Sequence, residues 1–256
     1  MSVIKEFSAD KLSVKVYADR AAMGAEAAKL CCEKIRQLLA EKDHINMIFA
    51  AAPSQNEFLA GLVAAKDIDW SRVNAFHMDE YIGLPSDAPQ GFANFLKRGL
   101  FDLLPFGSVN LLNGNAPDIA AECERYGKLL RDNPTDITCA GIGENGHLAF
   151  NDPPVADFSD PAAVKVVELD LVCRQQQVND GCFASLDLVP THALTLTIPS
   201  LLAAPYFFCM VPAVTKTEAV TRTVNEAVST ACPATVLRTK DGAILFVDSD
   251  SGANLL

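Results

Sequence analysis

The sequence predicts a three-layer α/β/α fold, a single domain built around a mostly parallel, Rossmann-like sheet. Strand-like and helix-like segments alternate along its 256 residues, and several strands are apolar throughout rather than at every second position. A strand that is apolar throughout is covered on both faces, and strands that alternate with helices form a parallel sheet between two helical layers. No internal repeat or flexible linker divides the sequence, so we expect one domain over residues 1–256.

The individual elements follow from residue propensity and hydrophobic periodicity. Residues 20–40 are rich in Ala, Leu, Glu and Lys, which favour a helix, whereas residues 45–52 form an almost continuous apolar run. The expected strands are residues 13–17, 45–52, 73–78, 109–112, 135–142, 193–197, 206–211 and 243–247. The expected helices are residues 20–40, 57–65, 90–104, 116–131 and 216–224. A loop rich in Gly, Asn and Pro extends from the strand at residues 135–142 to about residue 160.

Composition and charge narrow the choice of function. Hydrophobic residues make up 50% of the chain, enough for a sizeable core. The 32 acidic and 21 basic residues give a net charge of −11, and such a field repels nucleic acid and anionic membranes. An anionic substrate would therefore need a locally positive pocket. No apolar run is long enough to span a membrane, and residues 1–10 lack the apolar core of a secretory signal, so we expect a cytoplasmic protein.

The eight cysteines are also consistent with the reducing environment of the cytoplasm. They show no C-x-x-C spacing and no histidine in zinc-ligand register, so we expect reduced thiols and no metal site. They are Cys31, Cys32, Cys123, Cys139, Cys173, Cys182, Cys209 and Cys232.

Chemistry is expected in the loops beyond the carboxyl ends of the strands, where open parallel sheets bind ligands. The loop after residue 52 reads Pro-Ser-Gln-Asn-Glu, and Ser54 with Glu57 matches a capping box at the start of the next helix. A helix N-terminus at that place could bind an anion, although such boxes are also common as simple caps. The strand at residues 73–78 is followed by Asp79 and Glu80. One of these two carboxylates is expected to face the pocket and the other to make structural hydrogen bonds.

A third loop, residues 141–154, carries the strongest signal. Its three glycines within six residues let backbone amides approach a ligand, and His147 is suited to proton transfer near neutral pH. Asn145 and Asp152 flank this histidine in the same loop. The combination favours a catalytic site over a structural histidine.

These residues lie in segments that match a known family. The segments are 76–84 (FHMDEYIGL), 110–117 (NLLNGNAP), 189–196 (VPTHALTL) and the loop 141–153. From about residue 45 to residue 247, the chain resembles the glucosamine-6-phosphate deaminases, within a wider family that includes the 6-phosphogluconolactonases. The sequence Met-Asp-Glu-Tyr at residues 78–81 points to the deaminase branch.

The resemblance implies an enzyme of amino-sugar catabolism that needs no metal and no cofactor. Glucosamine 6-phosphate, or a close epimer, would become a ketohexose 6-phosphate and ammonia through an enediol-type intermediate. Asp79 matches the base that moves a proton between C2 and C1, and His147 matches the acid/base that opens the sugar ring. Asn145 and Asp152 fall at flanking catalytic positions. The residues implied in substrate or phosphate binding are Ser54, Gln55, Gly143, Gly146, Arg174 and Lys216.

Four departures from the family pattern mark a divergent member. The usual Gly- and Thr-rich phosphate loop is Ala-Ala-Pro-Ser-Gln at residues 51–55, and Pro53 has no N–H to offer. The family's Asp before Gly-His is Asn145, and its Glu in the following Phe-Asn-Glu-Pro segment is Asp152. A phosphate-binding arginine of the family falls near Asn179, with Arg174 as the nearby substitute.

Alternatives remain open at this point. A 6-phosphogluconolactonase-like hydrolase would need His147 but not Asp79, and a sugar-phosphate-binding regulator would bind without turnover. The glutamines at residues 175–177 are expected to be solvated or, alternatively, to cover the pocket. Since the chain lacks the C-terminal extension of some hexameric relatives, we expect a small homo-oligomer at most.

Overall fold

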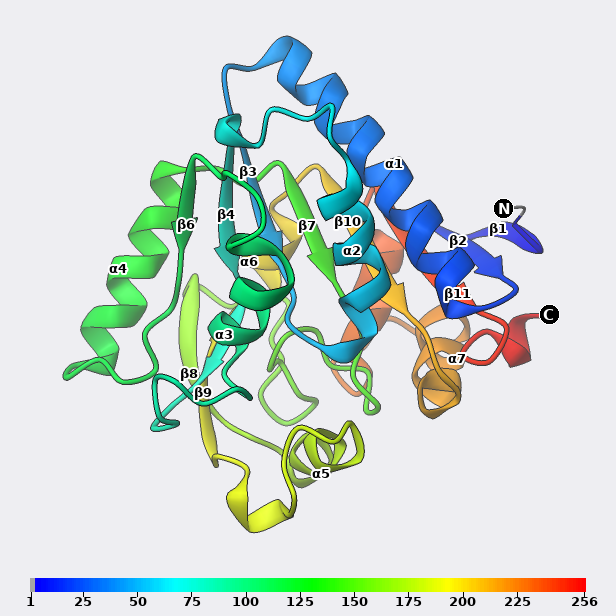
Figure 1. The fold of residues 1–256 in the computed structure, drawn as a ribbon. Helices are drawn as coiled ribbons and strands as arrows, with labels where there is room; N and C mark the ends of the chain where they lie inside the picture. Colours follow the sequence, from blue (N-terminus) through cyan, green and yellow to red (C-terminus); the bar gives the residue numbers. More distant parts are fainter. Residues whose placement is uncertain (1–2) are drawn as a thin grey trace.

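An eight-stranded sheet forms the centre of the computed structural model, which describes residues 3–256 (Figure 1). All neighbouring strands are parallel except the first pair. Across the sheet the strands are β1 (Lys5–Ala9), β2 (Leu12–Tyr17), β11 (Ala243–Asp248), β10 (Tyr206–Val211), β7 (Ile137–Ala140), β3 (Ile45–Phe49), β4 (Val73–His77) and β6 (Ser108–Asn110). Met1 and Ser2 lie outside the described residues. They belong to the expected domain, residues 1–256, and to the segment 1–10 in which no secretory signal was expected.

Helices cover both faces of this sheet, which confirms the predicted α/β/α layers. One core contains the inward faces of α1 (Arg20–Glu41), α2 (Asn56–Ala64) and α3 (Phe92–Leu96). The other contains those of α4 (Ile119–Asp132), α6 (Ile198–Leu202) and α7 (Thr217–Asn225). The remaining helix, α5 (Leu171–Asn179), lies beyond the carboxyl ends of β4 and β7, at the bottom of Figure 1.

The central strands are apolar throughout because each of them contributes side chains to both cores. In β3, Met47 and Phe49 belong to the first core, whereas Ile48 between them belongs to the second. In β10, Phe208 belongs to the first core and Phe207 to the second. Successive side chains of a strand point to opposite faces, so a strand between two helical layers needs apolar residues at nearly every position.

A second, three-stranded antiparallel sheet lies beside the large one. It consists of β5 (Asp79–Tyr81), β9 (His192–Leu196) and β8 (Val164–Glu168). The strand expected at residues 193–197 is therefore real but belongs to this small sheet rather than to the parallel one. The sequence did not predict β1, β5 or β8 as separate strands. The helix expected at residues 90–104 is shorter, with α3 continuing into a π-helical turn at Lys97–Phe101.

The capping box expected at Ser54 and Glu57 was wrong. Residues Pro53–Gln55 form a 3-10 turn, α2 begins at Asn56, and no side chain caps it. Glu57 instead forms a bidentate ion pair with Arg20, with Nε–Oε1 and Nη2–Oε2 distances of 2.8 and 2.9 Å. A fork-to-fork pair of charged groups is stronger than the neutral cap it replaces.

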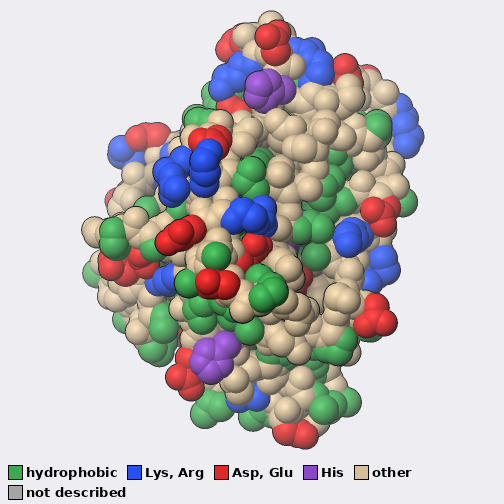
Figure 2. Space-filling model, turned by 90° about the vertical axis from the view of Figure 1, so that its left-hand side faces the viewer, with side chains coloured by type: hydrophobic (Ala, Val, Ile, Leu, Met, Phe, Trp, Pro, Cys, Tyr) green, Lys and Arg blue, Asp and Glu red, His purple; other side chains and the backbone are tan. Residues whose placement is uncertain are grey.

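Charged side chains of both signs lie on the surface. On the face shown in Figure 2, acidic and basic side chains are interspersed. Among residues 3–256, no helix is long and apolar enough to cross a membrane.

One tyrosine joins α4 to the end of β4. The Tyr126 hydroxyl accepts a hydrogen bond from the His77 N–H at 3.1 Å and lies 2.8 Å from the His77 carbonyl and 2.9 Å from the Asn110 carbonyl. All of these groups are buried or half-buried, so their hydrogen bonds have no ready replacement in water.

We therefore expect Tyr126→Phe to lower the free energy of unfolding by about 1–3 kcal/mol, because it leaves buried backbone groups of His77 without partners. Urea unfolding followed by circular dichroism measures this loss. Tyr206→Phe is the matched control, since its half-buried hydroxyl makes no hydrogen bond among residues 3–256. Equal losses in the two variants would contradict the role given to Tyr126.

Candidate functional site

A cavity of about 540 Å³ opens at the carboxyl ends of the parallel strands. Its walls come from the loops that follow β3, β4, β7 and β10, together with residues of α3 and α5. Volumes of this order are typical of small-molecule sites, and the position is where open α/β sheets bind their ligands.

Strand β9 supports two separate parts of the cavity. Thr195 lies opposite Asp79 in the β5–β9 register. The same Thr195 hydroxyl accepts a hydrogen bond from the N–H of Phe150 at 3.1 Å, and the Leu196 carbonyl accepts one from Asn151 Nδ2 at 2.8 Å. The strand that carries Asp79 and the loop that carries His147 are thus fixed to one scaffold.

Asp79 is the acid that faces the cavity. Asp79 is 7% exposed, and its carboxyl group makes no hydrogen bond or ion pair among residues 3–256. Burial, with a smaller contribution from the negative charge of Glu80, raises the pKa of Asp79 well above its usual value. A carboxyl group in this condition is free to exchange a proton with a bound molecule.

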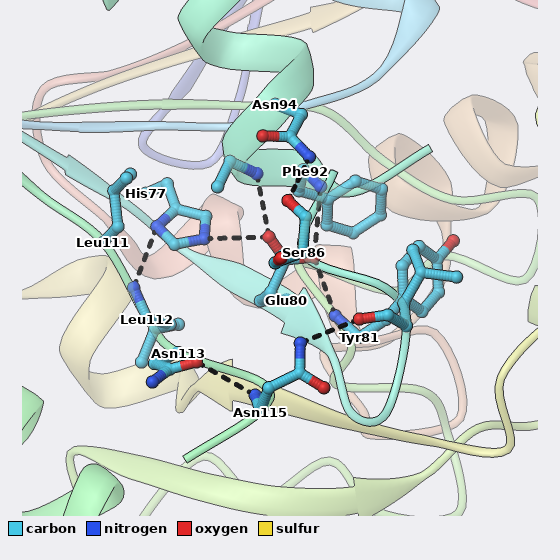
Figure 3. Close-up of polar contacts among 12 residues, drawn as sticks. His77, Glu80, Tyr81, Ser86, Phe92, Asn94, Leu111, Leu112, Asn113 and Asn115 are labelled. Atoms are coloured by element: carbon cyan, nitrogen blue, oxygen red, sulfur yellow. Dashed lines mark hydrogen bonds and ion pairs between the residues drawn. The ribbon is translucent and has the colours of Figure 1, made fainter. Parts of the chain in front are cut away.

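Glu80, the neighbouring acid, has a structural environment. Its carboxylate accepts hydrogen bonds from the N–H groups of Tyr81 at 3.0 Å, Phe92 at 3.1 Å and Ala93 at 2.8 Å (Figure 3). Two of these donors belong to the first turn of α3, so Glu80 holds that helix against β5. The two carboxylates are therefore divided as the sequence predicted, with Asp79 in the cavity and Glu80 in a hydrogen-bond network.

His77 completes the network around Glu80. Its Nδ1 accepts a hydrogen bond from the Leu112 N–H at 3.3 Å, which leaves the proton on Nε2, 3.7 Å from Glu80 Oε2 (Figure 3). Burial alone would raise the pKa of Glu80, but the nearby imidazole of His77 and the two N–H groups of α3 lower it overall.

His147 reaches the cavity over a glycine. A Cβ atom on Gly143 would lie 2.1 to 2.4 Å from atoms of the imidazole ring, so only glycine allows the ring to take this position. The backbone of His147 is fixed on both sides. Its N–H donates to Asn145 Oδ1 at 3.0 Å, and its carbonyl accepts from the Gly143 N–H at 3.0 Å.

Asp152 lies behind the imidazole. His147 Nδ1 is 2.8 Å from Asp152 Oδ1, a short contact outside well-aligned hydrogen-bond geometry, and Asn145 Nδ2 donates to the same oxygen at 2.9 Å. Burial would raise the pKa of Asp152, but the nearby imidazole of His147 and the hydrogen bond from Asn145 hold it below its usual value. Asp152 is thus an ionised carboxylate beside the imidazole of His147.

A lysine supplies positive charge in the cavity. Lys216 is only 5% exposed, lines the cavity and has no ion-pair or hydrogen-bond partner among residues 3–256. Burial lowers its pKa, although the negative charges of Asp180 and Glu144 act in the opposite direction. A buried ammonium group without a partner is costly, and an anionic ligand would relieve that cost.

The structure brings together five of the residues that the sequence singled out, all of which line the cavity. They are Ser54, Asp79, Gly143, His147 and Lys216. Asn145 and Asp152 lie immediately behind His147. Gly146 supports the loop, since its φ of +86° favours glycine and an added Cβ would lie 2.5 Å from the sulfur of Cys232.

Three predicted binding residues do not line the cavity: Gly146, which supports the loop, and also Gln55 and Arg174. Gln55 turns into the sheet, where its Nε2 donates to Ser54 Oγ at 3.0 Å and to the Met210 carbonyl at 3.2 Å. Arg174 donates to the carbonyls of Leu186 and Val189 at 2.7 and 2.9 Å, so it holds the segment after α5 and is not placed as a substitute phosphate ligand.

Several cavity residues escaped the sequence analysis. Arg20 and Arg98 reach the cavity from α1 and from the π-helical turn after α3, and Asp180 from the residue that follows α5. Gln176 and Gln177 are buried and line the cavity, as the alternative prediction for the glutamine run had it, whereas Gln175 is exposed to solvent as first expected. Only their helical spacing could have signalled them.

Comparisons with known proteins agree with this arrangement. The family model described as glucosamine-6-phosphate isomerases/6-phosphogluconolactonase matches residues 18–246. Proteins named glucosamine-6-phosphate deaminase from Bacillus thuringiensis (strain Al Hakam) and Bacillus anthracis (strain A0248) are each 34% identical over 226 residues, which is 88% of this chain and 84% of theirs.

Solved structures give the same picture. A monomeric glucosamine-6-phosphate deaminase matches with a TM-score of 0.85 at 26% identity, over 94% of this chain and 98% of that one. A 6-phosphogluconolactonase from Thermotoga maritima shares the fold, with a TM-score of 0.74 at 22% identity over 93% and 100% of the two chains.

The raised pKa of Asp79 predicts a pH-dependent change in stability. As the pH rises above about 4, the unfolded chain releases the Asp79 proton before the folded protein does, so the wild type loses stability up to the folded pKa. Asp79→Asn removes this loss. We expect the variant to melt at least about 3 °C above the wild type at pH 8, with a smaller gap at pH 5.

Calorimetric melting curves at the two pH values measure the gap. The exposed Asp87→Asn serves as the control, because it makes the same chemical change outside the cavity. If the difference in melting temperature were the same at pH 5 and pH 8, burial would not raise the pKa of Asp79 in the folded protein as described above.

Proposed function

Because the chain belongs to the glucosamine-6-phosphate isomerase/6-phosphogluconolactonase family, we propose that it is an amino-sugar phosphate deaminase. The reaction converts glucosamine 6-phosphate, or a close epimer, into a ketohexose 6-phosphate and ammonia. One observation carries the proposal: a single cavity is lined by Asp79, Lys216 and His147, and neither the buried carboxyl group of Asp79 nor the buried ammonium group of Lys216 has a partner among residues 3–256. Asp152 lies directly behind His147.

Lys216 is the anchor for the phosphate. The ammonium group gains a charge-assisted contact with a phosphate oxygen, while Ser54 offers a hydroxyl group from the neighbouring loop. Arg98 adds positive charge to the same cavity, whereas the guanidinium of Arg20 is already paired with Glu57. This set replaces the glycine-rich loop of the family and gives the acidic protein the local positive pocket that an anionic sugar needs.

His147 opens the ring. A proton must reach the ring oxygen while the hydroxyl at C1 loses one, and an imidazole can do both near neutral pH. Asp152 stabilises the protonated imidazole, and Asn145 orients Asp152 and the backbone of His147. The family pattern has an aspartate at the position of Asn145. Because Asn145 is neutral, the surroundings of His147 carry one negative charge fewer than in that pattern.

Asp79 moves the proton between carbons. As a carboxylate it takes the proton from C2 of the open-chain amino sugar, which gives an enediol-type intermediate, and then returns it to C1. The resulting imine at C2 reacts with water, which supplies the ketone oxygen, and ammonia leaves. The raised pKa makes Asp79 a stronger base than an exposed carboxylate.

The experiment that tests this reading is an ammonia-release assay with a panel of 2-amino-2-deoxyhexose 6-phosphates, with 6-phosphogluconolactone as the competing substrate. The proposal predicts ammonia from at least one amino sugar. Rapid lactone opening without any ammonia would favour the hydrolase. Tight binding of a sugar phosphate without turnover of any substrate would favour a regulator.

Replacing the proposed base gives a sharper test. Asp79→Asn should lower kcat for ammonia release by about 100- to 10,000-fold, because an amide cannot accept the C2 proton. The dissociation constant for the substrate, measured by calorimetry, should change little. Full activity in Asp79→Asn would exclude the enediol role and favour the lactonase chemistry, for which Asp79 is dispensable.

Lys216→Met should lower kcat/KM for the phosphorylated substrate by about 10- to 100-fold, the cost of one charge-assisted hydrogen bond. Steady-state kinetics measures this, with the exposed Lys66→Met as a matched control. The same loss with the unphosphorylated sugar would show that Lys216 does not recognise the phosphate.

The setting of the reaction follows from the same family. We propose a cytoplasmic enzyme that works as a monomer or a small homo-oligomer, supported by the similarity to a solved monomeric deaminase. Light scattering coupled to gel filtration measures the assembly state.

A further inference from the structure

Three buried side chains with metal-ligating atoms meet behind the cavity, although the cysteine spacing of the sequence predicted no metal site. His147, Asp152 and Cys173 each offer one atom, and these atoms all lie within 4.8 Å of one another. The three residues are 8%, 0% and 1% exposed, in that order. We name them the His147–Asp152–Cys173 cluster. Cys173 comes from α5, whereas the other two come from the loop after β7, so no sequence motif joins them.

Two atoms of the cluster are buried without a hydrogen-bond partner in the part of the chain that the structure describes, residues 3–256. Asp152 Oδ1 receives the hydrogen bond from Asn145, but Asp152 Oδ2 has none, and His147 Nδ1 has no aligned donor or acceptor. A polar atom that is buried without a partner loses its hydrogen bonds to water and gains none from the protein, which is unfavourable. A cation placed between these atoms would satisfy both at once.

The donor set and its charge fit a zinc-like ion. Imidazole nitrogen, carboxylate oxygen and thiolate sulfur are the ligands that Zn²⁺ takes, and in a tetrahedral site such atoms lie about 3.3–3.8 Å apart. Shifts of about 1 Å or less bring the cluster to that spacing. One carboxylate, one thiolate and a neutral imidazole balance a divalent cation, so the occupied site carries no net buried charge.

The surroundings already hold two of the ligands in place. Asn145 Nδ2 donates to the Asp152 carboxylate, the kind of support that a ligating carboxylate usually has, and Asn145 Oδ1 accepts from the backbone N–H of His147 and so fixes the loop that carries the ring. His147 also lines the cavity, so an ion can enter there, and a fourth position remains for water.

We propose that the His147–Asp152–Cys173 cluster binds Zn²⁺ reversibly and that the bound ion inhibits the enzyme. The inhibition rests on the proposed function, whereas the binding does not. Binding releases the thiol proton of Cys173 to solvent, together with the Nδ1 proton where the imidazole is protonated, and places the ion on Nδ1 of His147. Asp152 then neutralises the ion rather than an imidazolium, and protonating the ring beside a dication is unfavourable. His147 therefore loses its ability to carry a proton.

Binding is tested first, without any substrate. The chelator-treated, metal-free protein is titrated with Co²⁺, whose coordination by a thiolate gives a near-ultraviolet charge-transfer band, and bound Zn²⁺ is counted after equilibrium dialysis. The proposal predicts one ion per chain and a thiolate band. Cys173→Ser should lose the band and bind at least about tenfold more weakly.

Cys182→Ser is the matched control, because Cys182 also lines the cavity but lies outside the cluster. It should keep both the band and the bound ion. A band that survives in Cys173→Ser but disappears in Cys182→Ser would overturn the assignment, as would wild-type protein that binds no ion at micromolar zinc.

Activity is tested second. Zinc should inhibit ammonia release by the wild type and by Cys182→Ser, and a chelator should restore it, whereas Cys173→Ser should resist zinc relative to its own zinc-free rate. If the protein released no ammonia from any amino sugar, the proposed function would fail while the binding experiment still decided the metal site. Binding without inhibition would refute the regulatory part of the proposal.

Discussion

The structure depends on one constraint: strand β9 holds the two halves of the site together. Its Thr195 lies opposite Asp79 in the small sheet and accepts the hydrogen bond from Phe150, and its Leu196 carbonyl binds Asn151. Asp79 therefore lies on strand β5 and His147 on the loop after β7, yet both of these segments are held by strand β9. Catalytic groups that must act on adjacent atoms of one sugar need this precision, since misplacement by about 1 Å is costly.

Charge is arranged around that scaffold in an unusual way for an acidic protein. Most buried charges are satisfied internally, as Glu80 is by the first turn of α3 and by His77. Asp79 and Lys216 are the exceptions that line the cavity, and each has a pKa shifted by burial towards its neutral form. Leaving such groups without partners lowers stability, and a ligand that carries an anion and a removable proton recovers part of it.

The sequence predicted the parallel sheet because strands buried on both faces must be apolar throughout, as β3 and β10 are. It missed β8, which is exposed on one side, and β5, which follows β4 after a single residue without any turn signal. Asp79 and His147 were found because they follow the carboxyl ends of β4 and β7, whereas Lys216 was implied only by the family resemblance. Gln55 was misplaced because the direction of its side chain depends on the Met210 carbonyl of a distant strand. Arg20, Arg98 and Gln176 reach the cavity from helices, and only tertiary packing decides which helical face lies there.

The central claim is that one carboxyl group removes and returns a proton on adjacent carbons of a sugar phosphate held in this cavity. The most direct measurement runs the reaction backwards, with the ketohexose 6-phosphate and ammonium in D₂O, and follows C1 by NMR. Wild-type protein should replace one C1 hydrogen by deuterium, and Asp79→Asn, with the ligand still bound, should not. Equal deuterium uptake in both proteins, or none in a wild type that binds the sugar, would contradict the account.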